Sequence, residues 1–365
     1  MQARRTSDAP TSATSPHPSK PGRFLPLRNW WVRWRLVAVP VILAVAFLVQ
    51  ASFGIGSSLR VVRALDQGRR LAEFGRQVTA LVHELQTERD LTAGYMEVRA
   101  SNLKTRDVRD VVQGLTAQQP HVDQRVTAYR GAEPRVYDTL GPGQQARFDA
   151  ARAGLEDLGG VREAVASGSL AGEGIFDEYS QLIGRLLDVN LEIAQPGGGE
   201  ELTQSVRAFN DFSRVKEVTS QIRGSLHGIT YRGAFASGEF QVLAGLLGEQ
   251  RAATEQFQAD ASEQQRGLAA AVVTGQAVLA VDRMAQTALD RQASPRLEIE
   301  PAQWLAASST QIELMRSVES RVLDGVIGQS QDLSAAARRD ALRDALLIAL
   351  ILAVALLALF VEKRQ

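Results

Sequence analysis

Three arginines stand on segments with helical periodicity and lack the carboxylate that usually accompanies a helical arginine. Arg89, Arg223 and Arg283 have no Asp or Glu three or four residues away in either direction, which is where a partner on the same helix must lie. A guanidinium group is a planar fork of N–H donors that binds planar oxyanions through paired, charge-assisted hydrogen bonds. These arginines are therefore candidate contacts for a small oxyanion such as nitrate.

Arg89 lies on what should be a buried helical stripe. Apolar residues recur at steps of three and four from Leu71 through Leu85, and the next step is Arg89, a spacing typical of the core-facing side of a helix. A buried guanidinium is costly unless an anionic group meets it. The sequence therefore predicts an anionic partner from outside this helix, and the neighbouring Asp90 partly cancels the positive charge.

A second segment, residues 215–223, repeats features of residues 81–89. In both segments the arginine is followed five residues later by a glycine, Gly94 after Arg89 and Gly228 after Arg223. Other arginines have helical partners, and Arg214 is expected to meet Asp211 and Glu217. The alternative to an anion site is that each unpartnered arginine pairs with a carboxylate on another helix or extends to solvent. Arginines that each face a carboxylate would contradict the anion hypothesis.

No pattern in the chain predicts catalysis or a metal centre. Residues 83–87, His-Glu-Leu-Gln-Thr, resemble the phosphoacceptor box of histidine kinases, but no nucleotide-binding box accompanies them. The four histidines show no metal-ligand spacing, and Thr87 stands where a zinc-protease helix needs its second histidine. The chain has no cysteine. We expect no catalytic residue, no metal, no cofactor and no enzyme activity in this chain.

The charge distribution argues against nucleic acid as a partner. The 365 residues carry 41 basic and 41 acidic side chains, but residues 1–35 hold most of the imbalance, with seven basic residues and one acid. The rest of the chain is consequently acidic, unlike a general polyanion-binding protein.

Two uncharged apolar runs predict membrane helices. Residues 36–53 and 345–361 lack charges over 18 and 17 residues, close to the length that crosses ~30 Å of hydrocarbon. Tryptophans and arginines precede the first run and Lys363-Arg364 follow the second, which favours a two-pass cell-membrane protein with both termini cytoplasmic. The alternative for the first run is a signal peptide cleaved near Val49-Gln50-Ala51.

This topology divides the chain into five parts. We predict a disordered basic cytoplasmic tail (1–35), a first transmembrane helix (36–54), an extracellular helical sensor domain (55–341), a second transmembrane helix (342–361) and a cytoplasmic stub (362–365).

The region between the spans is predicted to be all-α, because three- and four-residue apolar spacing recurs without an alternating strand pattern. Turn-forming residues interrupt it, most strongly at Gln195–Gly199, and Gly172–Gly174 also reads as a connection. We expect about four helices on each side of residues 195–199, arranged as two antiparallel bundles that share long helices. Pro301 suits the first position of the last helix, whose continuity Gly325 and Gly328 weaken.

The two arginine segments resemble a known family. Residues 85–94 are similar to the Leu-Gln-x-Glu-Arg-Gly-x-Ser motif that opens the nitrate- and nitrite-sensing (NIT) domain, with Asp90 at its glycine. Residues 216–223 resemble the later Lys-Glu…Glu-Arg motif, with Ile222 at its second acid, and residues 304–319 also fit. The resemblance covers most of residues 65–335.

The resemblance implies an all-helical double bundle that binds nitrate or nitrite between its halves through Arg89, Arg223 and, by position, Arg283. It also implies the sensor region of a two-component receptor, usually a homodimer, which signals through its last helix to a cytoplasmic histidine kinase or to a partner. Two alternatives stay open at this point. The chain is a membrane-tethered helical interaction or structural protein without a small ligand, or it senses a different anion or metabolite.

Overall fold

The structure is a computed structural model that describes residues 30–100, 105–193 and 199–364. Every regular element in these ranges is helical, so the predicted all-α class is confirmed for the described part of the chain. Contacts divide the chain into two compact units, Met1–Phe53 with Ala345–Gln365, and Gly54–Asp344. The larger unit contains all three candidate arginines.

The helices are α1 (Trp30–Ala100), α2 (Thr105–Ala132), α3 (Pro134–Tyr137), α4 (Pro142–Ser167), α5 (Gly172–Asn190), the 3₁₀ turn η1 (Leu191–Ile193), α6 (Gly199–Arg232), α7 (Glu239–Asp260), α8 (Glu263–Val272), α9 (Gln276–Asp290) and α10 (Pro301–Arg364). The described residues thus form five helices on each side of residues 194–198 where four were expected. The additional ones, α3 and α8, are short. Gly172, predicted to lie in a connection, instead begins α5.

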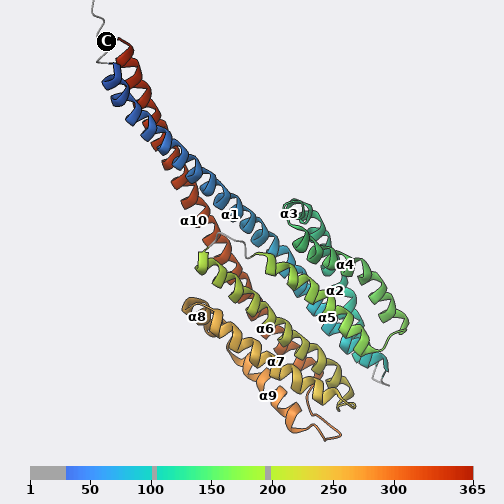
Figure 1. Cartoon of the computed structure of the whole chain (residues 1–365). Coiled ribbons are helices and arrows are strands. Elements are labelled where there is room, and N and C mark those ends of the chain that lie inside the picture. The colour runs from blue at the N-terminus through green and yellow to red at the C-terminus, as the bar shows by residue number, and fades with distance from the viewer. Residues whose placement is uncertain (1–29, 101–104, 194–198, 365) are drawn as a thin grey trace, which may run out of the picture. The chain divides into compact units, whose positions relative to one another are not determined.

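In the larger unit, α1 packs with α2, α4 and α5 (Figure 1). Leu71, Val78 and Leu85 of its predicted apolar stripe are at most 1% exposed. Phe74 lies on the same stripe, with its ring centroid 5.1 Å from that of Tyr129 in α2 and 5.6 Å from that of Phe148 in α4. The three- and four-residue spacing therefore marks the core side of this helix, and Arg89 lies on it.

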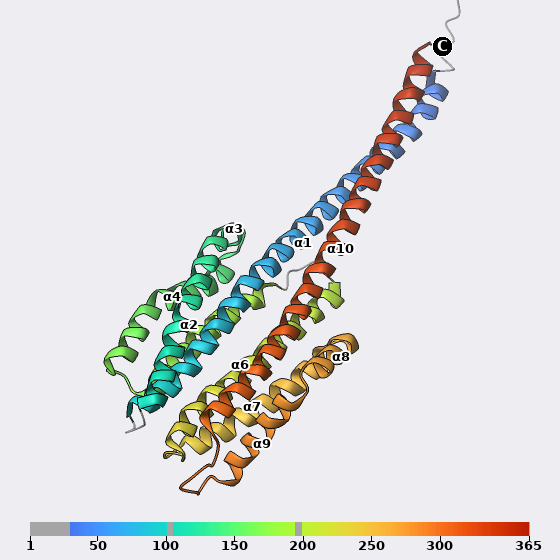
Figure 2. The same ribbon diagram turned by 180° about the vertical axis from the view of Figure 1, so that it is seen from behind.

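A second group of helices follows α6. Figure 2 shows α7, α8 and α9 along the side of α6 and the beginning of α10. Their own core contains Val218 and Leu226 of α6, Leu243 of α7, Val281 of α9 and Trp304 of α10. The chain reaches α10 through residues 291–300, and Pro301 occupies its first position as predicted.

Helices α1 and α6 run parallel. Side-chain hydrogen bonds between them join residues separated by 128 to 135 positions, and this separation stays nearly constant along their length. The two similar segments differ by 134 positions, so their arginines and glycines stand at comparable heights on neighbouring helices. The repeat in the sequence therefore corresponds to one seam, formed by α1 and α6.

Helix α10 runs antiparallel to α1 in the larger unit. Arg76 pairs with Asp324 at 2.6 Å, and Arg338 pairs with Asp66 at 2.6 Å. Gly325 and Gly328 do not interrupt α10, which continues from Pro301 to Arg364 as one helix. A single helix thus extends from the larger unit to the end of the described chain.

Within the described residues, no single helix is both long and apolar enough to cross a membrane. Helices α8 and α9 are so only as a pair, with a bend of 82° between them. The predicted division of the chain into tail, spans, sensor domain and stub stays a prediction.

Candidate functional site: a buried arginine–carboxylate seam

Arg89 is completely buried, and all three nitrogens of its guanidinium group donate hydrogen bonds. Its Nε donates to Asp90 Oδ1 at 2.9 Å, Nη1 donates to Glu217 Oε1 at 2.5 Å and to Ser180 Oγ at 3.0 Å, and Nη2 donates to Ser220 Oγ at 3.0 Å. The Phe176 ring covers it, with the centroid 4.8 Å from the guanidinium carbon. Arg89 of α1 thus contacts α5 and α6 at once.

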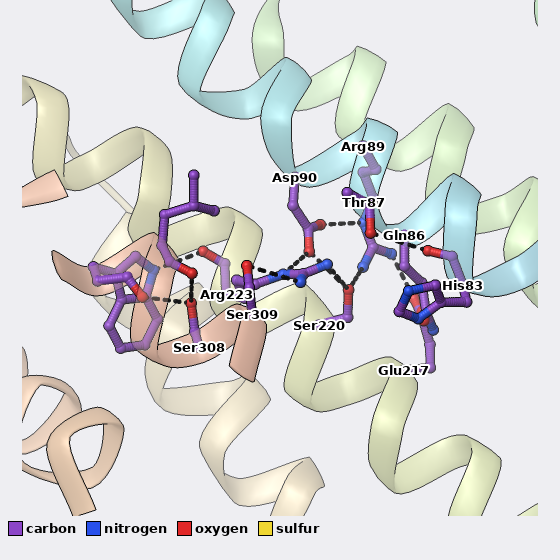
Figure 3. Close-up of polar contacts among 12 residues, drawn as sticks. His83, Gln86, Thr87, Arg89, Asp90, Glu217, Ser220, Arg223, Ser308 and Ser309 are labelled. Atoms are coloured by element: carbon purple, nitrogen blue, oxygen red, sulfur yellow. Dashed lines mark hydrogen bonds and ion pairs between the residues drawn. The ribbon is translucent and has the colours of Figure 1, made fainter. Parts of the chain in front are cut away.

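Arg223 approaches the same place from α6. Its Nε donates to Asp90 Oδ2 at 2.7 Å, and Ser220 Oγ donates to that oxygen at 2.7 Å. The Asp90 carboxylate therefore lies between the two guanidinium groups and accepts hydrogen bonds from both, as Figure 3 shows. We call Arg89, Asp90, Glu217, Ser220 and Arg223 the arginine seam.

The arginine seam is electrically balanced. Two guanidinium groups face two carboxylates, and the four side chains are at most 3% exposed. Burial opposes the charge of Arg89, but Glu217 and Asp90 outweigh that effect and raise its pKa. Removing any one of the four charged members would leave an uncompensated buried charge, which is the costly case for an ion pair.

These contacts decide how the two arginines are neutralised. Glu217, on another helix, meets Arg89, and Asp90 meets both Arg89 and Arg223. The pairing foreseen as the alternative to an anion site is therefore present, and it contradicts an anion site that stands open between the two arginines. The structure does bring Arg89 and Arg223 together on one planar oxygen-bearing group.

Helix α10 also contacts the arginine seam. Trp304 Nε1 donates to the Arg223 carbonyl oxygen at 2.9 Å, and Arg223 Nη1 lies 3.5 Å from Ser309 Oγ. About two turns before Arg223 on α6, Lys216 forms a buried ion pair with Glu319, which also accepts from Ser213 Oγ at 2.7 Å. A change in the seam is thus one contact away from α10.

Small residues allow α1 and α6 to approach closely near the arginine seam. A Cβ atom at Gly94 would lie 2.6 Å from His227 Nε2, and one at Gly224 would lie 2.5 Å from Asp90 Oδ1. His227 is 1% exposed, and neither of its ring nitrogens has a hydrogen-bond partner in the described part of the chain. Burial, together with the charge of Arg223, lowers its pKa to about 4 despite the opposing effect of Asp90.

A separate cluster lies on the other side of α1. Glu88 is fully buried and accepts from Arg162 Nε at 2.7 Å, Arg162 Nη2 at 2.8 Å and Tyr179 Oη at 2.8 Å. Arg162 also reaches Asp123 of α2 at 2.7 Å. We call these four residues the Glu88 cluster. It joins α1 to α2, α4 and α5, whereas the arginine seam joins α1 to α6.

Sequence reasoning placed some side chains wrongly. Arg283 lies on the exposed side of α9, where its Nε donates to the Leu279 carbonyl oxygen at 3.2 Å, and no contact joins it to the described arginine seam. Arg214 pairs with Glu249 of α7 instead of Glu217. The parallel packing of α1 and α6 turns Glu217 toward Arg89, and spacing along one helix does not reveal a partner on a neighbouring helix.

The serines that contact Arg89 and Arg223 were not expected from the sequence. Ser180, Ser220 and Ser309 supply hydroxyl groups around the guanidinium groups, and no sequence signal distinguishes them from other serines.

His83, which resembles a phosphoacceptor, is buried with Nε2 2.8 Å from Glu313 Oε1 of α10. Burial lowers the pKa of His83, and its hydrogen bond lowers the pKa of Glu313 to about 2. Among the described residues, no acidic or histidine cluster is arranged to hold a metal ion.

Comparison with known proteins decides the family. The model of the family described as "Nitrate and nitrite sensing" (NIT) matches residues 80–327, about two thirds of the chain. The chain belongs to the NIT family. The matched region of this NIT protein includes the arginine seam and the Glu88 cluster, and it ends within α10. No curated protein matches the chain.

A solved structure supports the fold of this NIT protein. The structure of the NasR transcription antiterminator is similar over 88% of this chain and 85% of its own, with a TM-score of 0.61 and 20% sequence identity. At that identity the similarity concerns the helical architecture alone. The NIT domain is a sensing domain, and no enzymatic domain is indicated.

Proposed function

We propose that this NIT protein is the sensor region of a two-component membrane receptor that responds to nitrate or nitrite. The family match supports a nitrate- or nitrite-sensing role. The arginine seam is the part of the described structure best suited to the ligand, because its guanidinium groups come from two different helices. Planar oxyanions are bound well by such convergent forks.

One observation carries the choice of ligand class. The two oxygens of the Asp90 carboxylate are shared between Arg89 and Arg223, and the distances are 2.9 Å and 2.7 Å. A carboxylate, nitrite and nitrate all present two oxygens in one plane on a single central atom. The seam therefore already has donors at the positions that a planar monovalent oxyanion needs.

The output proposed for this sensor is a movement of α10. Arg223 contacts α10 through Trp304 and Ser309, and α10 continues without interruption to Arg364. Because a buried arginine cannot lose its anionic partner without cost, a change of partner at Arg223 biases how α6 and α10 pack. A kinase module or a partner protein in the cytoplasm is the proposed recipient of that signal.

The proposed membrane topology rests on sequence and exposure. Residues 36–53 and 345–361 are uncharged, and their basic flanks favour cytoplasmic ends;. Large apolar side chains in both segments are exposed in the described structure, among them Ile42, Leu346 and Leu350, which a hydrocarbon environment would cover. The sensor domain would then lie outside the cell, and a homodimer is proposed because membrane receptors usually signal as symmetric pairs.

Titration calorimetry of the purified full chain tests the ligand. Sodium nitrate and sodium nitrite should each release binding heat that sodium chloride at equal ionic strength does not. Arg223→Lys should abolish that heat, because an ammonium group cannot reproduce the planar fork. Arg283→Ala is the matched control and should leave it unchanged. No nitrate- or nitrite-specific heat in the unaltered chain would rule out the named ligands.

The absence of native cysteines gives a simple test of topology. Arg283→Cys, at an exposed position of α9, should react with a membrane-impermeant maleimide on intact cells. Ser19→Cys should react only after the cells are opened. Labelling of Ser19→Cys on intact cells, or protection of Arg283→Cys, would contradict the proposed orientation.

A membrane-tethered helical interaction protein without a small ligand is the second candidate. The specific observation in its favour is that Arg89 and Arg223 are already neutralised by Asp90 and Glu217. The calorimetric titration separates the two candidates, since only the sensor releases nitrate- or nitrite-specific heat.

A further inference from the structure

Asp90 occupies the position in the arginine seam where an external oxyanion would have to bind. Its carboxylate touches both guanidinium groups and the Ser220 hydroxyl, and the residue is 1% exposed. No second place between Arg89 Nε and Arg223 Nε is left for another anion, because both of these donors already point at Asp90. Any ligand that uses the same two donors must replace this carboxylate.

The packing around Asp90 leaves space for that carboxylate. Gly224 of α6 is buried, and a Cβ atom there would lie 2.5 Å from Asp90 Oδ1 and 2.7 Å from Phe176 Cε2. Glycine within a helix destabilises it relative to alanine, so a packing requirement accounts for Gly224. The space it creates on α6 holds the Asp90 carboxylate between the two arginines.

The charges of the arginine seam lead to the same conclusion. With Asp90 and Glu217 ionised, two negative charges balance Arg89 and Arg223. An additional nitrate would bring an uncompensated negative charge into a buried site, which is unfavourable. Exchange of nitrate for the Asp90 carboxylate keeps the balance of the seam when the released carboxylate turns out of the seam into water, and so does the addition of one nitrate after the charge at residue 90 is removed.

We infer that Asp90 is an intramolecular competitor that sets the affinity and size selectivity of the arginine seam for external oxyanions. This inference rests on the proposed function. A tethered group competes at a high effective concentration, on the order of millimolar or above. The unaltered chain should therefore respond only to high concentrations of nitrate or nitrite, and binding should release Asp90 from Arg223. That release is the step that connects the ligand to α6 and, through Trp304, to α10.

The inferred role also predicts which anion fits which variant. Asp90→Ala removes the carboxyl group and leaves a space that matches nitrite in size. Asp90→Gly removes the whole side chain and leaves a space that matches the larger nitrate. Both substitutions leave the seam with one excess positive charge, so one monovalent anion restores neutrality.

The experiment measures the thermal midpoint of the full chain against added sodium nitrate and sodium nitrite, with sodium chloride at equal ionic strength. Both Asp90 variants should melt below the unaltered chain in chloride. Nitrite should raise the midpoint of Asp90→Ala, and nitrate that of Asp90→Gly, with half-saturation at concentrations lower by about tenfold or more than in the unaltered chain, as expected for removal of a tethered competitor.

Glu88→Ala is the matched control. It also removes a fully buried carboxylate of α1 from an arginine, but Arg162 is partly exposed and keeps Asp123 as an anionic partner, so it needs no external anion. We expect no nitrate- or nitrite-specific rise of its midpoint. Asp90→Asn keeps the size of the side chain and removes its charge. It is used if the smaller variants do not fold, and its half-saturation should also fall below that of the unaltered chain.

The outcomes separate the inference from the proposed function. Equal half-saturation in the unaltered chain and in the Asp90 variants would overturn the inference and leave the proposed function standing. A specific response of the Asp90 variants alone would support the inference and contradict nitrate or nitrite sensing by the unaltered chain. A response in none of these chains would overturn both the inference and the proposed function. A nitrate- or nitrite-specific response of Glu88→Ala equal to that of the Asp90 variants would overturn the special role of Asp90.

Discussion

Two buried carboxylates stand almost next to each other on α1, and their surroundings differ. Glu88 faces α2, α4 and α5 and meets one arginine, Arg162, whose side chain is 19% exposed. Asp90 faces α6 and is shared by two arginines that have almost no contact with solvent. The Glu88 cluster is therefore an ordinary structural ion pair, whereas the arginine seam concentrates two cations on one anionic group.

The difference shows how one helix can join two bundles with different properties. A guanidinium at the protein surface can exchange its carboxylate for water at modest cost. Two buried guanidinium groups cannot do so, and they need an anion from some source. Two residues of an α-helix turn by about 200°, so Glu88 and Asp90 face opposite sides of α1 and meet different helices.

Replacing an arginine should give the largest difference in the free energy of unfolding between the arginine seam and the Glu88 cluster. Arg89→Met leaves Asp90 and Glu217 with one cation between them, and we expect a loss of about 3–5 kcal/mol in the free energy of unfolding. Arg162→Met leaves the fully buried Glu88 with Tyr179 as its remaining partner, and we expect about 3 kcal/mol, the lower end of that range, because the Tyr179 hydroxyl still donates to it. Chemical denaturation of the full chain measures both values. A larger loss for Arg162→Met would contradict the distinction drawn here.

The pH dependence of the free energy of unfolding should also distinguish the surroundings of the arginine seam from an exposed helix surface. The pKa of His227, beside the arginine seam, falls from 6.5 to about 4 because of burial. The unfolded chain therefore binds the proton more strongly between those values, and stability decreases as pH falls from 6.5 toward 4. The loss should reach about 3 kcal/mol near pH 4.

His227→Leu should reduce this slope, and His121→Ala, at an exposed position of α2, should leave it unchanged. Denaturation curves recorded between pH 7 and pH 4.5 provide the comparison. An unaltered slope in His227→Leu would show that another group causes the acid sensitivity.

Adding a methyl group to a glycine should have opposite effects on stability in the closely packed arginine seam and on an open helix surface. Gly224→Ala should lower stability by about 1–3 kcal/mol, because its Cβ meets both Asp90 and Phe176;. Gly159→Ala, in α4, meets nothing within 4 Å and should raise stability by about 0.5–1 kcal/mol through helix propensity;. Thermal melts of both variants check the signs, and a stabilising Gly224→Ala would mean that the seam has unused space.

Removing a serine hydroxyl group should have the smallest effect on stability. Ser180 accepts from Arg89 at 3.0 Å, whereas Ser309 lies 3.5 Å from Arg223. Ser180→Ala should therefore cost about 1 kcal/mol and Ser309→Ala at most about 0.5 kcal/mol. If denaturation reverses this order, Ser309 of α10 holds Arg223 more firmly than its distance indicates.

The sequence predicted the elements better than the contacts between them. Periodicity identified the helical class and the core side of α1, and it placed Arg89 on that side correctly. It also identified Pro301 as the start of α10. Each of these features depends on residues within one helix, so spacing along the chain is sufficient to reveal it.

The membership of the arginine seam was only partly predictable. Arg89 and Arg223 were selected because they lack helical partners, and the structure brings them together. Glu217 was assigned to Arg214, and Arg283 was grouped with the other two arginines although it lies on the exposed side of α9. The parallel register of α1 and α6 determines which carboxylate reaches which arginine, and that register depends on packing between distant segments.

The central claim is that Arg89 and Arg223 bind a small planar oxyanion in the place that Asp90 fills. A crystal structure of the Asp90→Gly chain grown with sodium nitrate tests it most directly. The account predicts one nitrate per chain within hydrogen-bond distance of Arg89 Nε and Arg223 Nε, with the Ser220 hydroxyl as its third partner. Nitrate bound elsewhere, or an arginine seam closed by Glu217 alone without any anion, would contradict the account.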